Sequence, residues 1–266
     1  LAAAAPVDAG ADPALAAAEP AVLADAASVR AVELALSAIR SRTVEKVVLS
    51  RLVPVQSDVD LVGTYAAGRR LNPSPRSVLL SLHDVELAAF CPETVVSVAP
   101  SGALTSEPVA GTRACPPDPV EAARLASELR SDPKEVYEHV ISIRAMLDDL
   151  REICVGDGAV ASDLLSVRRR GAVQHLGTRV SGHLARGRTA WDAFGALFPA
   201  VTATGVPPSR ARALIEELEP APRGLYGGAA LRVEHDGTFD ASLILRAVMR
   251  RDGRTWLRAG GGIVPG

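Results

Sequence analysis

Aromatic residues are scarce in this chain of 266 residues: they make up 3% of the composition, and the formal net charge is −2. A nucleic-acid surface usually has a basic stripe and rings on which bases stack, so we expect no nucleic-acid partner. Runs of about 18 apolar residues, the length of a membrane-spanning helix, are absent, and we expect no membrane span. A small anionic ligand is compatible with this composition, because a few arginines can bind it whatever the overall charge.

Cysteine is rare as well. Cys91, Cys115 and Cys154 are odd in number and lack the spacing of metal ligands, so we interpret them as reduced core cysteines of a cytoplasmic protein. The first residues lack the basic segment and apolar core of a cleavable signal. Residues 1–24, which are rich in Ala and Pro, are predicted to form a leader or linker, and residues 25–266 one domain.

Lysine is rare: the chain has two lysines, Lys46 and Lys134, and 27 arginines. Lys46 lies in TVEKVVLSR, residues 43–51, whose aliphatic and β-branched side chains predict a buried strand. Alternation along a strand places Lys46 on the same face as Val44 and Val48, where an ammonium group is costly to bury. Lys46 is therefore a candidate functional residue.

Helical periodicity and short apolar runs alternate along the rest of the chain. The periodicity predicts helices at residues 25–42, 58–70, 132–154 and 191–198, and a helix that ends near Glu219. The apolar runs predict a meander over residues 77–112 and further hairpins towards the C-terminus, with turns at His83-Asp84, Ser101-Gly102, His235-Asp236-Gly237 and Arg251-Asp252-Gly253. This order of elements predicts an α+β fold with large, mainly antiparallel sheets.

The segment that starts at Asp132 has the strongest helix signal, because Asp132 is a good N-cap and Pro133 suits the first helical position. Its predicted core stripe consists of Val136, Val140, Ile143, Leu147 and Leu150. An adjoining face carries Glu135, Glu138, His139 and Ser142. Two carboxylates at i and i+3 can hold a hard cation such as Mg²⁺. Acidic residues near a helix start also stabilise the helix dipole, and both interpretations stay open.

Four further signals are weaker. Gly111 and Thr112 in EPVAGTR can present backbone N–H groups to a carboxylate, although most such glycines form turns. The cluster Gly260–Gly262 at a strand end allows close approach of a ligand. Arg246 lies in LILRAVM, a predicted apolar strand, and needs a carboxylate partner from the protein or from a ligand. The spacing around His175 favours a structural histidine.

Taken together and in this order, these segments resemble the chorismate-utilising enzymes: KVVLSR, CPETVVSV, EPVAGTR, KEVYEHVISIR, VQHLGT, FPAVTATGVP, RGLYGGA and LRAGGGIV. That superfamily includes the anthranilate, aminodeoxychorismate, isochorismate and salicylate synthases. The likeness is greatest to the salicylate synthases of siderophore pathways, because of GTR after PVA, RRRGAVQHLGT and TATGVP. The resemblance implies an anthranilate synthase component I-like fold, in which packed antiparallel sheets with helices outside hold chorismate and Mg²⁺.

The resemblance also implies roles for single residues. Lys46 would be the general base for the water that attacks the chorismate ring, a role closed to arginine because its pKa stays above about 12. Glu93 would be the general acid that protonates the departing hydroxyl. The other implied roles are ring-carboxylate binding by Gly111 and Thr112, pyruvyl-carboxylate binding by Tyr226 and Arg246, lining by Gly260, Gly261 and Gly262, metal binding by Glu135 and Glu138, and substrate contact by His175 and Thr202.

The function implied is that of a salicylate synthase, which isomerises chorismate to isochorismate and then eliminates pyruvate. An isochorismate synthase and a silent chorismate-binding homologue or fragment are the alternatives. We expect a cytoplasmic monomer that depends on Mg²⁺. The family's N-terminal portion and its second acidic pair, after the GIV motif, have no counterpart before Lys46 or up to Gly266. We therefore expect residues 25–266 to be a chorismate-binding catalytic domain that is truncated at its C-terminus and incomplete at both ends.

Overall fold

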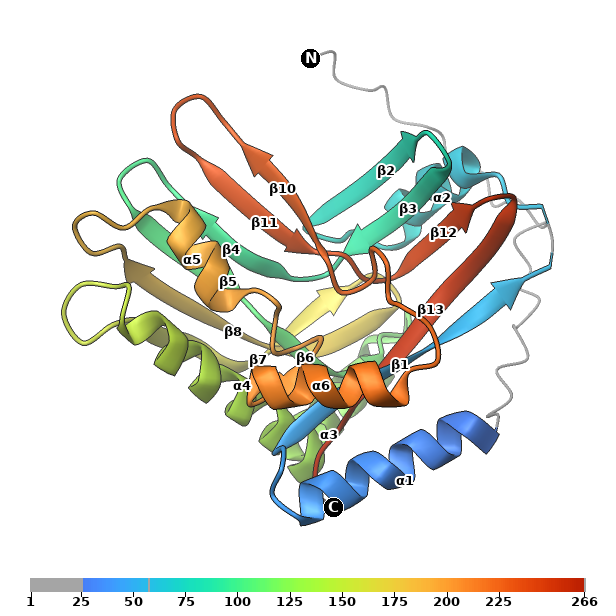
Figure 1. Cartoon of the computed structure of the whole chain (residues 1–266), viewed down its shortest axis with the longest axis horizontal. Coiled ribbons are helices and arrows are strands. Elements are labelled where there is room, and N and C mark those ends of the chain that lie inside the picture. Colours follow the sequence, from blue (N-terminus) through green and yellow to red (C-terminus); the bar gives the residue numbers. More distant parts are fainter. Residues whose placement is uncertain (1–25, 57, 266) are drawn as a thin grey trace.

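The computed structural model describes residues 26–56 and 58–265. Two sheets dominate this part of the chain, and helices pack against them (Figure 1). The first sheet is six-stranded, in the order β2-β3-β12-β13-β1-β9. Its strands are β1 (Lys46–Val55), β2 (Arg76–Leu82), β3 (Val85–Cys91), β9 (Gly205–Val206), β12 (Ala247–Arg251) and β13 (Arg254–Ile263).

The second sheet is seven-stranded. It runs β10-β11-β4-β5-β8-β6, and β7 also pairs with β8. Its strands are β4 (Thr94–Val98), β5 (Ala103–Glu107), β6 (Val109–Ala114), β7 (Val160–Arg170), β8 (Val173–His183), β10 (Ala229–Val233) and β11 (Phe239–Leu243). All paired strands among the described residues are antiparallel. The predicted α+β class with large antiparallel sheets is confirmed.

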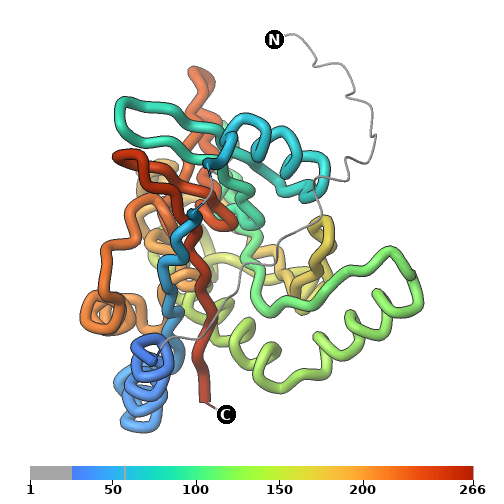
Figure 2. Tube along the Cα trace, turned by 90° about the vertical axis from the view of Figure 1, so that its right-hand side faces the viewer, coloured from blue at the N-terminus to red at the C-terminus, as the bar shows by residue number. Residues whose placement is uncertain are grey.

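The helices of the described residues are α1 (Ala26–Arg40), α2 (Leu61–Leu71), α3 (Pro119–Ser131), α4 (Pro133–Arg151), α5 (Ala190–Leu197) and α6 (Pro208–Leu218). Helices α1 and α6 pack against β1 around a buried cluster that includes Ile39, Val47 and Ile215. Figure 2 shows β13, in red, beside β1, in blue, so the first sheet joins the two ends of the described chain. None of these described helices is both long and apolar enough to cross a membrane.

Helix α4 begins as predicted, but its buried face is rotated from the predicted stripe. The Asp132 carboxylate accepts hydrogen bonds from the backbone N–H groups of Lys134 (3.0 Å) and Glu135 (3.3 Å). Val140, a predicted core residue, is 42% exposed, whereas His139 is fully buried. The reason is that His139 packs against β8, where its Nε2 lies 2.7 Å from the Thr178 hydroxyl. Glu138 and Ser142 are buried on the same side of the helix.

The predicted meander over residues 77–112 is wrong, because the chain passes from one sheet to the other within it. Strands β2 and β3 form a hairpin in the first sheet, and β4 and β5 form one in the second. Pro92 and Glu93 lie at this first crossing. The segment LILRAVM is likewise divided between β11 and β12, which belong to different sheets. Arg246 therefore lies at a second crossing, with a φ of 48°, and not in a strand.

Helix α3 was missed, although its start carries an ordinary helix signal: Asp118 caps it by accepting from Val120 N–H, and Pro119 holds the first position. The other helices lie close to their predicted ranges. The predicted leader, residues 1–24, lies outside the described residues.

Candidate active site

A cavity of about 470 Å³ is lined by residues of both sheets and of α4. This volume lies within the range of about 300–1,000 Å³ that is usual for small-molecule sites. The structure brings every site residue predicted from the sequence to this cavity, because all of them line it except Lys46, which contacts one that does. The lining members are Glu93, Gly111, Thr112, Glu135, Glu138, His175, Thr202, Tyr226, Arg246, Gly260, Gly261 and Gly262.

The two crossings between the sheets position the charged ends of the cavity. Glu93 leaves β3 and Arg246 leaves β11 at points where the chain belongs to neither sheet, so both side chains reach the space between them. A non-glycine residue with positive φ is uncommon and costs free energy. The φ of Arg246 is therefore consistent with a residue held in place for its side chain.

Lys46 begins β1 and is completely buried. Its Nζ lies 3.0 Å from Glu138 Oε1 and donates a hydrogen bond of 3.1 Å to the Ser142 hydroxyl. Val48, two residues on, lines the cavity, as alternation predicts. Val44 does not share this face, because it packs with the cluster under α1 and α6. The cost of burying the ammonium group is offset by its ion pair and hydrogen bond.

Glu138 contacts both lysines of the chain. Lys134 Nζ lies 2.8 Å from its Oε2, while Lys46 holds the other oxygen. Burial alone would raise the pKa of Glu138, but the charges and hydrogen bonds of Lys46 and Lys134 outweigh it and lower the pKa. Glu138 is therefore an ionised carboxylate. Both of the two lysines in the chain form ion pairs with it.

Glu93 is the second buried acid, and its surroundings differ from those of Glu138. The Thr202 hydroxyl donates to Glu93 Oε1 at 2.6 Å, and Val109 N–H donates to Oε2 at 3.3 Å. Burial raises the pKa of Glu93 to about 7, although these two hydrogen bonds and the charge of Lys46 act against the rise. A carboxyl group that exchanges its proton near neutrality suits a general acid. Thr202 thus contacts the acid, besides lining the cavity.

This raised pKa predicts a stability effect that Glu93→Gln removes. Between the ordinary pKa of 4.5 and about 7 the folded protein binds more protons at this site than the unfolded chain, so stability falls as pH rises through this window. The loss amounts to about 3 kcal/mol, since one pKa unit is about 1.4 kcal/mol. We expect the unfolding free energy of Glu93→Gln, relative to the parent, to rise by about that amount between pH 4.5 and 8 in urea titrations.

Thr202→Val provides the matched control for this pH dependence. It removes a donor that favours the charged form of Glu93, so it should raise the pKa further and extend the loss of stability to higher pH, with the onset near pH 4.5 unchanged. A difference between parent and Glu93→Gln that stays constant across the same pH range would contradict the raised pKa.

Arg246 and His175 form the other charged end of the cavity. Arg246 donates to Asn72 Oδ1 at 3.1 Å and through Nη2 to His175 Nε2. Since arginine only donates, His175 Nε2 accepts, and the proton on Nδ1 is donated to the Gly111 carbonyl at 2.8 Å. Burial, with Arg246 and Arg170 nearby, lowers the pKa of His175 to about 4, so the ring is neutral.

Arg246 has no carboxylate partner among the described residues. The sequence predicted a partner from the protein or from a ligand, and the described part of the protein supplies only neutral groups. Its guanidinium therefore presents an uncompensated positive charge to the cavity, where an anionic ligand would find it. Asn72, which orients this group, was not predicted; its position between a helix end and a proline gave no functional signal.

Glycine is required where two side chains approach the backbone of β13. A Cβ on Gly260 would lie 2.5 Å from the Tyr226 hydroxyl oxygen, and one on Gly262 would overlap the Glu138 carboxylate. A Cβ on Gly261 would meet nothing within 4 Å. Gly111, at φ 64°, is similarly close to Glu135, because its Cβ would lie 2.7 Å from Oε2. These glycines let Tyr226 and both glutamates reach the cavity wall.

Glu135 and Glu138 are the groups in the cavity that suit a metal ion. Their oxygens are hard donors one helical turn apart, and Mg²⁺ is commonly bound by one or two carboxylates while water and ligand oxygens complete its shell. No cluster of three or more Asp, Glu, His or Cys with metal-site geometry occurs in the described residues. Asp132, and not either glutamate, accepts the N–H bonds at the start of α4. The pair therefore fits Mg²⁺ in donor type.

Arg258 is a cavity-lining residue that the sequence did not predict. It is buried, and its guanidinium bonds to the Ser50 hydroxyl (2.8 Å) and to Glu219 Oε2 (2.6 Å). Its place in β13 just before the glycine cluster was the available signal. Arg258 differs from Arg246 because it has a carboxylate partner, Glu219, which it shares with Arg223.

A family model described as chorismate binding enzyme matches residues 16–266. The chain belongs to this family of chorismate-binding enzymes, and the resemblance inferred from the sequence is confirmed. A salicylate synthase of Mycolicibacterium paratuberculosis is 43% identical over 233 residues, which are 88% of this chain and 52% of that protein. The chain thus spans about half the length of the curated relatives it matches.

Solved structures agree with this assignment. Anthranilate synthase component I from Streptococcus pneumoniae matches with a TM-score of 0.81 and 30% identity, over 91% of this chain and 54% of that one. The menaquinone-specific isochorismate synthase from Escherichia coli matches with a TM-score of 0.77 and 26% identity, over 88% of this chain and 54% of that one. The predicted anthranilate synthase component I-like fold is therefore confirmed.

Proposed function

We propose that this chain carries the catalytic centre of a salicylate synthase, which converts chorismate through isochorismate to salicylate and pyruvate. The observation that carries the proposal is a pair of buried groups: Lys46, which contacts the cavity-lining Glu138, and Glu93, an acid whose pKa is raised to about 7. An acid and a base held in different environments are the means by which a site moves protons in both directions near neutral pH. The 43% identity to a salicylate synthase supports the same choice.

In the first half-reaction a hydroxyl group moves around the ring. Lys46 takes a proton from the water that adds to chorismate, and Glu93 gives a proton to the hydroxyl that leaves as water, so one water enters and one departs. In its ion pair with Glu138 the Lys46 side chain is an ammonium group, and only the neutral amine can accept the proton. The Thr202 hydroxyl and Val109 N–H hold the Glu93 carboxyl in position.

In the second half-reaction pyruvate leaves isochorismate. Electrons move within the bound molecule and no protein nucleophile is needed, so the protein's part is to hold the side chain over the ring. Arg246, whose charge has no carboxylate partner in the described residues, binds the pyruvyl carboxylate together with Tyr226. Gly111 and Thr112 bind the ring carboxylate at the end of the cavity where His175 fixes the Gly111 carbonyl.

Glu135 and Glu138 would hold Mg²⁺ in the proposed enzyme. A bound ion would supply positive charge beside the ring carboxylate, which would draw electron density away from the ring. Glu138 is kept ionised by the two lysines, and Glu135 lies 3.6 Å from Arg113 Nη1. Both side chains are largely buried and line the cavity.

A product assay tests the proposal. The chain is incubated with chorismate and with isochorismate in the presence of Mg²⁺, and isochorismate, pyruvate and salicylate are quantified separately. We expect salicylate and equal amounts of pyruvate from both substrates. Formation of isochorismate without pyruvate would identify an isochorismate synthase. Chorismate binding detected by calorimetry, without any product, would identify a silent chorismate-binding protein. Either result would overturn the assignment as a salicylate synthase.

A further inference from the structure

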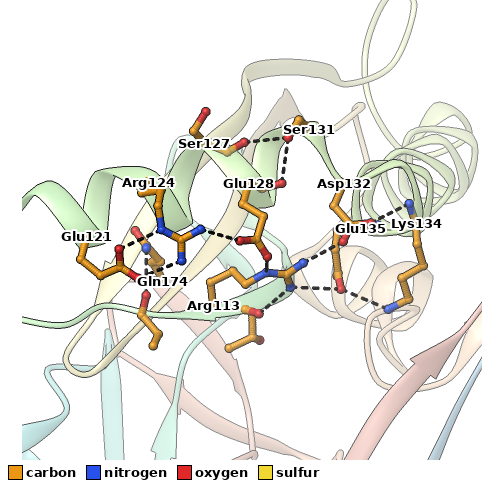
Figure 3. A network of polar contacts seen from close by, with 12 residues as sticks. Arg113, Glu121, Arg124, Ser127, Glu128, Ser131, Asp132, Lys134, Glu135 and Gln174 are labelled. Carbon is orange, nitrogen blue, oxygen red and sulfur yellow. Dashed lines mark hydrogen bonds and ion pairs between the residues drawn. The ribbon is translucent and has the colours of Figure 1, made fainter.

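Lys134 Nζ lies between the two carboxylates of the cavity wall. It is 2.8 Å from Glu138 Oε2 and 3.4 Å from Glu135 Oε1. Figure 3 shows its side chain turned toward Glu135, while Arg113 approaches Glu135 from the opposite side. An ammonium group thus bridges the pair of oxygens assigned above to a cation.

We propose that the Lys134 ammonium is a resident, displaceable cation, which neutralises the Glu135–Glu138 pair until a divalent metal ion takes its place. The proposal rests on the metal role given to this pair in the proposed function. In this proposal Lys134 determines the metal affinity, because each metal ion that binds must first displace the Lys134 ammonium from the two carboxylates.

The exposure of the two lysines shows which of them can leave. The Lys134 side chain is 42% exposed, whereas that of Lys46 is 0% exposed. An ion pair at a partly exposed position contributes little to stability, because water replaces it at small cost. Lys134 can therefore swing into solvent, while Lys46 has no such path.

The carboxylates keep other partners when Lys134 leaves. Glu138 retains Lys46 at 3.0 Å, and Glu135 retains Arg113 at 3.6 Å. Arg113 is itself fixed by Glu128 (2.9 Å) and Asp132 (2.7 Å). The pair would remain oriented for a metal ion, so the exchange needs a movement of one side chain and no rearrangement of α4.

The choice of lysine is informative in a chain with 27 arginines. Arginine grips carboxylates with two parallel hydrogen bonds, whereas lysine is a compact point charge on a flexible stem. An arginine at position 134 would bind Glu135 and Glu138 more firmly and would resist displacement by a metal ion. Lysine is thus the basic residue suited to a cation that has to be displaced.

Two substitutions with opposite expected effects test the proposal. Mn²⁺ binding to the chain is measured by isothermal calorimetry without substrate, with Mg²⁺ as competitor. Lys134→Met removes the competing cation and should tighten Mn²⁺ binding on the order of tenfold, the scale of effects from partners of metal-binding carboxylates. Lys134→Arg should weaken binding below that of the parent. The expected order of affinity is Lys134→Met, parent, Lys134→Arg.

Arg144→Met is the matched control. Arg144 lies on the same helix and is 53% exposed, but it pairs with Glu45 outside the cavity. The Arg144→Met substitution removes the same unit of positive charge as Lys134→Met. A comparable gain in Mn²⁺ affinity in Arg144→Met would show that the overall charge, and not displacement of Lys134, causes the gain. Thermal unfolding without metal confirms that each variant is folded.

Each outcome decides the matter. Unchanged or weaker Mn²⁺ binding in folded Lys134→Met, or no binding in both it and the parent, overturns the proposal. Tighter binding in both Lys134→Met and Lys134→Arg also overturns it, because charge would then be irrelevant. The proposed function fails separately: a chain that shows the expected order of Mn²⁺ affinity but forms no salicylate from chorismate keeps the displaceable lysine and loses the reaction.

Discussion

Lys46→Met is expected to reduce turnover of chorismate by about 10²–10⁴-fold, the usual contribution of a general base, while pyruvate release from supplied isochorismate continues. The reason is that only the first half-reaction needs a proton removed from water. Methionine keeps most of the volume of the buried side chain, which limits the effect on packing. Steady-state kinetics of the parent and of Lys46→Met, measured with each substrate in turn, tests both expectations.

Lys46→Arg separates the charge of Lys46 from its basicity. Arginine can keep an ion pair with Glu138, whose Oε1 lies 3.0 Å from the Lys46 ammonium, but it does not deprotonate under these conditions. The variant should fold, as circular dichroism would show, and should be as slow on chorismate as Lys46→Met. Recovery of chorismate turnover in Lys46→Arg would mean that the charge matters and that another group is the base.

The sequence predicted local structure well because local signals are complete within a few residues. The start of α4 needs only Asp132 and Pro133, and the structure has the expected cap. Burial of Lys46 followed from its apolar neighbours in one strand. The missed helix α3 has a comparable start at Asp118 and Pro119, so its beginning too is encoded locally.

The assignment of strands to sheets could not be predicted in the same way. β3 and β4 are separated by two residues, yet one pairs with β12 and the other with β11. Which partner a strand finds depends on packing between segments far apart in the chain, and apolar patterns carry no label for it. The strand break at Arg246 has this origin, since the apolar pattern runs through a point where the chain changes sheets.

The site shows the same division. Lys46, Glu93 and Arg246 stood out as charged residues in apolar surroundings or in familiar motifs, and the structure places them at one cavity or in contact with it. The pairings between site residues could not be predicted. Thr202, for example, was implied as a substrate contact, but its hydrogen bond of 2.6 Å to Glu93, 109 positions away, was not predicted. The rotation of α4 that buries Glu138 beside Lys46 depends on the contact of α4 with β8 and is likewise a tertiary effect.

Arg246→Lys is expected to slow the turnover of chorismate and of isochorismate together, because both half-reactions use the same grip on the pyruvyl carboxylate. Lysine keeps the charge but loses the fork that forms two parallel hydrogen bonds with a carboxylate. It also loses the geometry with which Arg246 bonds Asn72 and His175 at once. A charge-assisted hydrogen bond contributes about 1.5–3 kcal/mol, so kcat/KM should fall on the order of 10–150-fold for both substrates.

Arg250→Lys is the matched control for this prediction. Arg250 lies four residues further on, in β12, where it pairs with Glu86 at 3.0 Å and does not line the cavity. The same chemical change there should leave both activities near those of the parent. The decisive comparison is the ratio of the two losses in Arg246→Lys: a ratio near one places Arg246 on a group common to both substrates. A folded Arg246→Lys enzyme that processes both at the parent rate would instead make Arg246 a structural partner of His175, and the anion at that end of the cavity would need another anchor.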